Sequence, residues 1–207
     1  MPTRIMITPH TLLPPHVAVL FARRDSVYKR IPCTMVYDID RDARTYVGEC
    51  PVIAHPPCRA WGRLRTFANP RPDEKELAPW AVSQVLRWGG VLEHPAHSSL
   101  WPHCGLPYPG QPPTGAGTWS LSIDQHWFGH RARKRTWLLI HGITPQQLPA
   151  YPIAWVLPSH VIATTRGAHK HPECTKSERE HTPEAFARWL VQVGQLINTT
   201  FTPQHLT

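Results

Sequence analysis

The chain lacks the features that mark a membrane protein or a secreted protein. No apolar run among its 207 residues approaches the roughly 20 residues that cross a bilayer. Prolines interrupt the stretch from Met1 to Asp25, which has no small-residue cleavage site, so we expect neither a signal peptide nor an anchor. The five cysteines are an odd number without a Cys-x-x-Cys pair, which argues against a disulfide framework and favours a reducing cytoplasm.

Internal repeats and low-complexity tails are also absent from the sequence. The 24 prolines are dispersed between apolar segments, a pattern that favours many ordered loops. A chain of this length can bury a core of its own. We therefore expect a single domain over residues 1–207, and a monomer.

Acidic residues are scarce relative to basic ones. There are 22 lysines and arginines against 14 aspartates and glutamates, a net charge of +8. Such a balance favours an acidic partner, of which nucleic acid is the commonest. Because no apolar run could cross a bilayer, we expect no membrane partner. A mildly basic protein without such a partner is the alternative.

Short apolar segments alternate with helical patterns. We expect strands at 16–22, 33–40, 50–55, 91–95 and 136–143, helical turns at 26–31, and helices at 72–90 and 182–197. Residues 95–119 are rich in proline and glycine and should form one long loop. This alternation predicts an α/β sheet whose site lies at the carboxyl ends of its strands.

Two segments place reactive side chains at such strand ends. In "AHPPCRAWG", prolines hold the Cys58 thiol still, and Arg59, Arg63 and Arg65 can favour its thiolate. In "GGVLEHP", Glu93 closes an apolar strand, where burial should raise its pKa into the range of a proton donor. A structural cysteine and an ion-paired glutamate are the alternative interpretations.

A third segment is basic. In "DQHWFGHRARKRTWLLIHG", Arg131, Arg133 and Arg135 alternate before a strand and should share one face. With Lys134 and the neighbouring aromatic residues they suit phosphate contact and base stacking. A solvated run of charge is the alternative.

Together the three segments resemble the DNA cytosine-5 methyltransferase family, in the form of a short, divergent, phage-like member. That family carries a Pro-Cys nucleophile loop, a strand with Glu-Asn-Val, and a Gln-x-Arg-x-Arg segment after Phe-Gly, in this order. The likeness covers residues 17–140. The matching positions are Pro57-Cys58, then Leu92-Glu93-His94-Pro95, then Phe128-Gly129 with Arg133 and Arg135.

The resemblance implies a reduced Rossmann-like methyltransferase sheet with helices on both faces. It implies that the Cys58 thiolate adds to carbon 6 of cytosine, that Glu93 protonates ring N3, and that Arg133 or Arg135 holds O2 or a flanking phosphate. The base would be flipped from double-stranded DNA or taken from single-stranded DNA. Residues expected to contact the DNA are Arg59, Trp61, Arg63, Arg65, His94, Arg131 and Lys134.

The same resemblance implies S-adenosyl-L-methionine as cofactor, and a location in the cytoplasm, that of the host if the gene is a phage gene. The cofactor would lie near the loop after the first strand and the acids after the second. The residues expected there are Phe21, Ala22, Asp25, Asp38, Asp40 and Pro56. A different one-carbon donor, or a modified cofactor bound by Arg23 or Arg24, is the alternative.

The chain departs from the family pattern in several places. The glycine-rich cofactor loop reads "LFARRDSVYKRI", without glycine. If residues 37–40 follow the family's third strand, the second strand and its ribose-binding acid are absent or reduced. Arg131 replaces the Gln, and His94 replaces the Asn. Residues 141–181 leave room for only a minimal recognition region, which predicts a short or relaxed sequence context.

Three other functional classes stay open at this point. A non-catalytic DNA-binding relic would account for the altered cofactor loop. An amino-methyltransferase would use "HPPC" as its catalytic loop, although His55 matches that role poorly. A zinc protein would use His169, His171 and Cys174, whose spacing in "HKHPEC" matches no standard finger.

Overall fold

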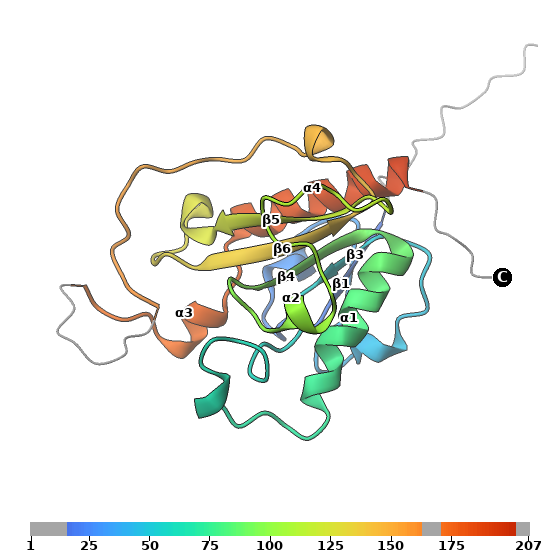
Figure 1. Cartoon of the computed structure of the whole chain (residues 1–207). Coiled ribbons are helices and arrows are strands. Elements are labelled where there is room, and N and C mark those ends of the chain that lie inside the picture. The colour runs from blue at the N-terminus through green and yellow to red at the C-terminus, as the bar shows by residue number, and fades with distance from the viewer. Residues whose placement is uncertain (1–15, 163–170, 202–207) are drawn as a thin grey trace, which may run out of the picture.

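The computed structural model describes residues 16–162 and 171–201 (Figure 1). It contains one mixed sheet of six strands. The strands are β1 (Val17–Leu20), β2 (Thr34–Val36), β3 (Val52–Ala54), β4 (Gly90–Pro95), β5 (Thr118–Asp124) and β6 (Arg135–His141). The α-helices are α1 (Glu74–Trp88), α2 (Leu100–His103), α3 (Lys176–Glu180) and α4 (Glu184–Thr200). Short 3-10 turns are η1 (Val27–Arg30), η2 (Ala43–Thr45), η3 (Arg65–Phe67), η4 (Gln125–Phe128) and η5 (Pro145–Gln147).

The order of the strands brings one set of loops to one edge. Across the sheet the order is β2-β1-β3-β4-β6-β5; the first four strands are parallel, and β6 is antiparallel to both β4 and β5. The carboxyl ends of β1, β3, β4 and β5 therefore meet the start of β6. The chain direction across the sheet reverses between β1 and β3, and crevices at such reversals are where open α/β sheets bind ligands.

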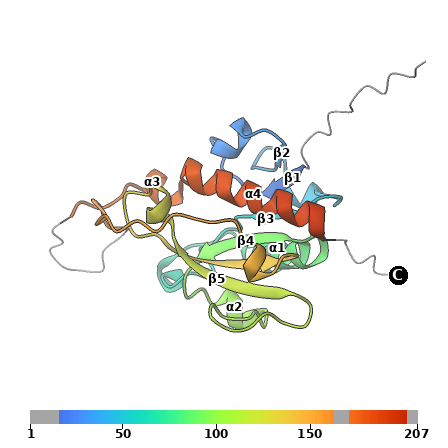
Figure 2. The same ribbon diagram turned by 90° about the horizontal axis from the view of Figure 1, so that it is seen from above.

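Helices cover both faces of the sheet (Figure 2). Val17 and Val19 pack with α4 in one apolar cluster, while Ala18 and Leu20 pack with α1 in the other. Successive residues of a strand point to opposite faces, so a fully apolar β1 is expected when both faces are covered. The predicted α/β class with helices on both faces is confirmed.

The predicted helices at 72–90 and 182–197 are confirmed as α1 and α4. Gly89, with φ of 74°, ends α1, a conformation that favours glycine. Among the described residues, no helix combines the length and the apolar character that a bilayer-spanning segment requires.

The loop expected over residues 95–119 contains more structure than its composition indicated. Leu100 and Trp101 of α2 are fully buried, and the Trp101 indole donates a hydrogen bond to Ser120 at 2.9 Å. The strand β5 was not predicted. Its register with β6 is continuous from Thr118 opposite His141 to Asp124 opposite Arg135.

The strand expected at 33–40 forms as the shorter β2, so no gap is left where a second strand could have been missing. β2 pairs directly with β1, with Thr34 opposite Val17 and Val36 opposite Val19. Asp38 and Asp40 therefore follow the second strand of the chain.

One close approach limits how α4 can change. A Cβ atom at Gly194 would lie 2.8 Å from a methyl group of the fully buried Val17. Gly194→Leu should lower the free energy of unfolding by about 1–3 kcal/mol, because a stiff β-branched neighbour cannot move aside. Urea denaturation measures this. Gly115→Leu is the matched control, since a Cβ atom there meets nothing within 4 Å; equal losses in both variants would contradict the expected close contact.

Candidate functional site

The loop that carries Cys58 is anchored at its base. β3 ends at Ala54, and the Cys58 carbonyl accepts hydrogen bonds from the amides of Trp61 at 3.0 Å and Gly62 at 2.7 Å. Trp61 is buried, and its indole donates to the Lys75 carbonyl at 3.1 Å. The expectation that Trp61 contacts DNA is therefore wrong; it holds the Cys58 loop against α1.

A buried carboxylate clamps the far part of this loop. Glu74 is fully buried and is bound by the guanidinium of Arg59, while Arg71 donates its backbone amide to the same carboxylate at 3.3 Å. Arg59 was expected to favour the Cys58 thiolate and to contact DNA. In the structure the Arg59 guanidinium instead forms an ion pair with Glu74.

The Cys58 thiol is not the activated thiolate that the arginines implied. Burial raises its pKa, and the negative charge of Glu93 raises it further. The positive charge of Lys134 opposes both. Cys58, Glu93 and Lys134 therefore lie within electrostatic reach of one another, from three different segments of the chain.

Glu93 lies at the centre of a hydrogen-bonded row. Its Oε2 is 3.1 Å from Nδ1 of His55, and its Oε1 accepts from the Gln125 amide at 3.0 Å. The other nitrogen of His55 lies 3.0 Å from the Tyr28 hydroxyl, and Gln125 also donates to Thr136 at 3.0 Å. Only 12% of the His55 side chain and 11% of the Glu93 side chain are exposed.

The pKa of Glu93 moves in the opposite direction to the prediction. Burial alone would raise it, but the hydrogen bond from His55 and the charge of Lys134 outweigh burial and lower the pKa to about 2. Glu93 is thus an ionised hydrogen-bond acceptor at neutral pH and not the protonated proton donor that was predicted.

Lys134 is the cation of this site. Burial lowers its pKa, whereas Glu93, Cys58 and Glu180 raise it, and its ammonium donates to the His181 carbonyl at 3.2 Å. It was expected to contact DNA. The alternation Arg131, Arg133, Arg135 leaves those three side chains exposed, while Lys134 between them is mostly buried.

His94 is not accessible to DNA, contrary to the prediction. It is fully buried beside Trp101, with ring centroids 6.5 Å apart. Neither ring nitrogen has a hydrogen-bond partner among the described residues. Burial lowers its pKa to about 4, although the charge of Glu93 and the nearby Pro57 backbone act to raise it, so the ring is neutral.

Sequence reasoning missed three members of the site: Tyr28, His55 and Gln125. His55 follows β3 and Gln125 follows β5, so both come from ends that meet at the same edge of the sheet. Position at a strand end was the available indication for His55. No such indication existed for Gln125, because β5 was not predicted. The side-chain oxygen Oε1 of Gln125 is buried and has no hydrogen-bond partner among the described residues.

The three acids predicted to bind the cofactor are each paired with a basic side chain. Asp25 pairs with Arg23 at 2.9 Å, Asp38 with Lys29 at 2.5 Å and Asp40 with Arg24 at 2.6 Å. Asp38 also accepts from the amides of Asp40 and Arg41, and the bond to Lys29 lowers its pKa to about 2. Each carboxylate of this group therefore already has a basic partner in place of a ribose or an ammonium group.

The backbone of this loop is also unlike a glycine-rich cradle. Phe21 adopts φ of 60°, and its ring packs edge-on against Trp80 at 5.8 Å. Ala22 donates to the Tyr37 carbonyl at 2.9 Å, and Pro56 is buried. A hollow of about 440 Å³ nearby is lined by the side chains of Arg23, Arg24, Asp25 and Glu180. As placed, these residues do not fit S-adenosyl-L-methionine.

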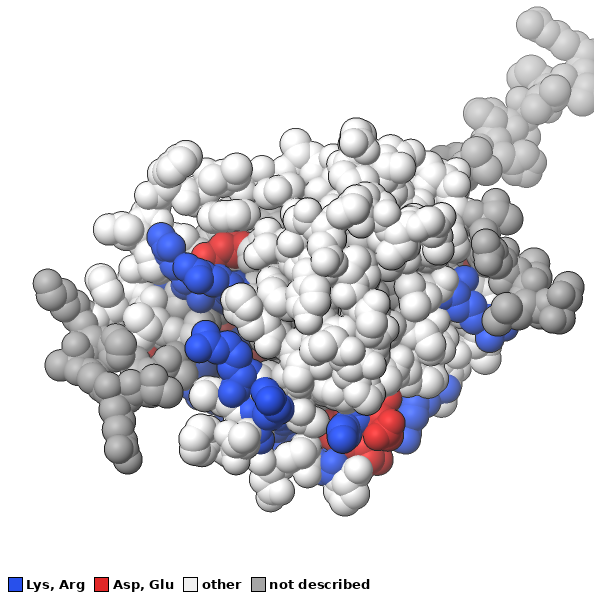
Figure 3. Space-filling view, in the orientation of Figure 1, with Lys and Arg blue, Asp and Glu red and all other residues white. Residues whose placement is uncertain are grey.

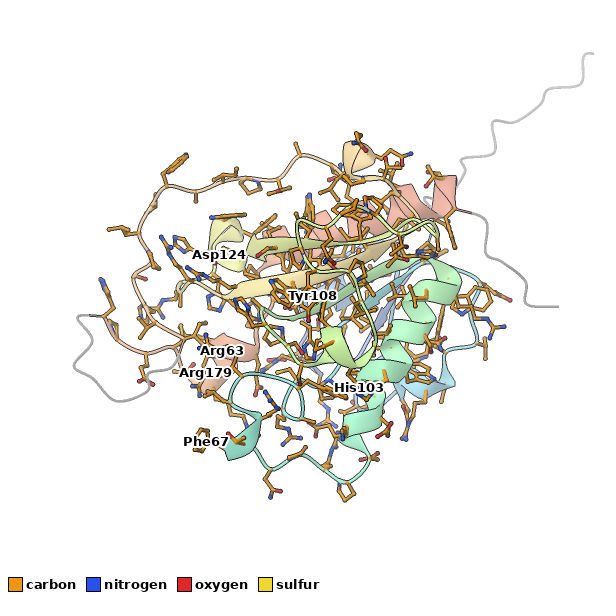
Figure 4. The ribbon with its side chains drawn as sticks, viewed as in Figure 1. Arg63, Phe67, His103, Tyr108, Asp124 and Arg179 are labelled. Atoms are coloured by element: carbon orange, nitrogen blue, oxygen red, sulfur yellow. The ribbon has the colours of Figure 1, made fainter. Side chains whose placement is uncertain are left out.

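Basic side chains gather at the same edge (Figure 3). Arg63, Arg133 and Arg135 are exposed and form no ion pair or side-chain hydrogen bond with any described residue. Arg65 reaches only the Gly62 carbonyl, at 3.5 Å. Arg131 pairs with Glu178 of α3. Figure 4 shows Arg63 on its loop and Asp124 at the end of β5, both at this edge.

Exposed apolar side chains accompany these cations. Phe67 is 86% exposed beside Arg65, and Trp155 is 92% exposed. The segment with Trp155 is fastened to the edge, because the Val156 carbonyl lies 2.7 Å from His126 and the His160 amide donates to Arg131 at 3.1 Å. It lies within the region 141–181 that was predicted to be a minimal recognition region.

The zinc hypothesis gains no support from the described residues. They contain no group of three or more His, Cys, Asp or Glu side chains that could hold a metal ion. Cys174 is buried and His171 is exposed, and His169 lies outside the described residues. All five cysteines are free thiols.

No family model, curated protein or solved structure matches this chain.

The depressed pKa of Glu93 predicts a specific acid sensitivity. Its contribution to stability is complete above its ordinary pKa of 4.5 and is lost as pH falls toward about 2. Over that window the free energy of unfolding should fall by on the order of 2 kcal/mol through this group. In Glu93→Gln the free energy of unfolding, measured by urea denaturation at several pH values, should fall over this window by about 2 kcal/mol less than in the wild type. The control Glu76→Gln, exposed on α1, should lose as much free energy of unfolding over this window as the wild type. An equal loss in Glu93→Gln would refute the depressed pKa of Glu93.

Proposed function

We propose that this protein is a DNA cytosine-C5-modifying enzyme, a transferase of the cytosine-5 methyltransferase type that works through a covalent bond between Cys58 and carbon 6. The observation that carries the proposal is the meeting of Cys58, Glu93 and Lys134 at one sheet edge, where each acts on the pKa of another. A nucleophile, an acceptor and a cation in one partly buried place are the parts that such an addition needs.

The topology supports the proposal at a coarser level. The strands β2, β1, β3 and β4 are parallel. β2 is added on one side of β1 and β3 on the other, so the order of strand addition reverses at β1, as in Rossmann-like folds. Cys58 follows β3 at this reversal. The proposed fold is therefore a reduced Rossmann-like methyltransferase sheet.

The proton count of the first step suits an ionised Glu93. Sulfur bonds to carbon 6, the C5=C6 electrons shift to form C4=C5, the C4=N3 electrons move onto N3, and ring N3 takes up one proton. The thiol releases one proton in the same step. The Glu93 carboxylate accepts the proton from the thiol and delivers it to N3, so no external acid is needed.

The surrounding groups suit cytosine. The buried Oε1 of Gln125, without a partner among the described residues, can accept from the exocyclic amine of the base. Lys134 supplies a positive charge beside Glu93 and Cys58, and we assign to it the stabilisation of charge on the base that was expected of Arg133 or Arg135.

The second step replaces the hydrogen on carbon 5. The C4=C5 electrons bond to an electrophile, the carbon 5 proton leaves, and sulfur departs as C5=C6 re-forms; the N3 proton returns to sulfur. The resemblance implies a methyl group from S-adenosyl-L-methionine. Because the β1 loop does not fit that cofactor, the proposal leaves its binding residues unassigned and includes another one-carbon donor.

DNA is the proposed partner, with the target base flipped or single-stranded. The exposed Arg63, Arg65, Arg133 and Arg135 face the edge where Cys58 lies and suit phosphate contact. Phe67 and Trp155 beside them suit base stacking. The region 141–181 is too short to read a long site, so we expect a short or relaxed context.

A non-catalytic DNA-binding relic is the second candidate. It is favoured by the raised pKa of Cys58 and by the three paired carboxylates after β1 and β2. On that account the basic edge would keep its affinity for DNA, and the site would perform no chemistry.

A donor-free experiment separates the two candidates. In heavy water the covalent adduct takes a deuteron at carbon 5, and loss of the original proton leaves deuterated cytosine. DNA incubated with the protein and digested for nucleoside mass spectrometry should contain deuterium at carbon 5, and Cys58→Ser should reduce incorporation to the rate without protein.

Cys104→Ser, which changes a half-buried thiol far from β3 in the sequence, is the matched control and should exchange as the wild type does. DNA binding without exchange by the wild type would establish the relic. Exchange that survives Cys58→Ser would overturn the covalent mechanism. Repeating the incubation with S-adenosyl-L-methionine then shows whether a methyl group replaces the deuterium.

The arginines predict the salt dependence of DNA binding. Replacing Arg133 and Arg135 together by Ala should reduce the slope of log Kd against log salt by about 1.4 on single strands or 1.8 on duplex. Fluorescence anisotropy measures the slope. Arg188→Ala, an exposed arginine paired with Glu184 on α4, is the control and should leave it unchanged; equal slopes in both variants would exclude this edge as the phosphate contact.

A further inference from the structure

His55 is the one member of the site with a side chain partner on each ring nitrogen. Nδ1 lies 3.1 Å from Glu93 and Nε2 lies 3.0 Å from the Tyr28 hydroxyl. A carboxylate only accepts, so Nδ1 carries a proton and donates it. Burial raises the pKa of Tyr28 well above its ordinary value, so the hydroxyl keeps its proton. Tyr28 therefore donates to Nε2 when the ring is neutral.

Both bonds survive a change in the charge of the ring. If His55 gains a proton, Nε2–H donates to the Tyr28 oxygen, and Nδ1–H still donates to Glu93. Tyr28 thus fixes the orientation of the imidazole in either state. The ring in turn fixes the carboxylate, because it occupies Oε2 while Gln125 occupies Oε1.

We propose that His55 is a positioning residue that holds Glu93 as an oriented carboxylate, ready to take the proton released when Cys58 adds to the base. The proposal rests on the proposed function and deepens it. The charged and titratable groups around the pair are Tyr28 from η1, Lys134 before β6, and His94 and Cys58 on either side of Glu93.

The consequence is a defined pH dependence. Without the His55 bond, the largest of the interactions that outweigh burial is lost, and the pKa of Glu93 rises. The carboxylate is then protonated at a higher pH and cannot accept the thiol proton. The acidic limb of the exchange rate should therefore move to higher pH when His55 is removed.

The test is the pH profile of deuterium exchange at carbon 5. His55→Ala should lose far more activity at about pH 5 than at about pH 8, with the acidic limb displaced upward. His55→Asn, which can still donate to Glu93, should move the limb back toward the wild-type position. Tyr28→Phe, which removes one hydroxyl and keeps the ring, should give a smaller displacement in the same direction. His141→Gln is the matched control, since His141 is a buried histidine bonded to Thr118 at the opposite end of β6.

A second measurement separates this proposal from the proposed function. Carbon-13 NMR of the Glu93 carboxyl group needs no activity, and in His55→Ala its titration should move to higher pH than in the wild type. A titration that does not move, or a loss of exchange that is equal at every pH, would overturn the role of His55. Absence of exchange in the wild type together with a moved titration would overturn the proposed function and leave His55 as the residue that orients Glu93.

Discussion

The carboxylate of Glu93 is the constraint on which the edge of the sheet depends. An ionised carboxylate with little solvent contact is costly unless donors surround it. Those donors come from the end of β3, through His55, and the end of β5, through Gln125, with the charge of Lys134 ahead of β6. Satisfying one buried charge therefore fixes how three loops meet, and the Cys58 loop follows directly from His55.

Much of this arrangement was predictable from the chain alone, because strong local patterns carry it. The helical spacing that ends at Gly89-Gly90 predicted α1, and an apolar run placed Cys58 in the loop after β3, whereas Glu93, expected at a strand end, lies within β4 opposite Leu138. The strand β5 was missed because a proline- and glycine-rich stretch precedes it, although Trp119, Leu121 and Ile123 alternate as strand residues do. Alternation also predicted that the three arginines share a face, but not that Lys134 would turn inward.

Charges were less predictable than strands, because their partners lie far away in the sequence. Glu93 meets His55 across 38 positions and Gln125 across 32. The sign of its pKa shift is set by His55 and Lys134 and not by burial, which acts in the opposite direction. Arg59 was assigned to a thiolate or to DNA, and no local pattern indicated that a buried Glu74 would take its charge. The acids after β1 and β2 were likewise assigned to a ligand, and each has a basic partner of its own.

The ion pairs of Glu74 affect how the loop from Arg59 to Arg71 would contact a partner. One carboxylate binds Arg59 at the start of that loop and Arg71 at its end, so the intervening chain is closed at its base. A loop closed in this way has already lost much of its conformational entropy when the protein folds. Arg63, Arg65 and Phe67 are then presented by a preorganised lobe, and binding need not supply that ordering cost a second time. If DNA is the partner, as proposed, its affinity and the stability of the fold are thermodynamically linked through Glu74, a residue that is fully buried.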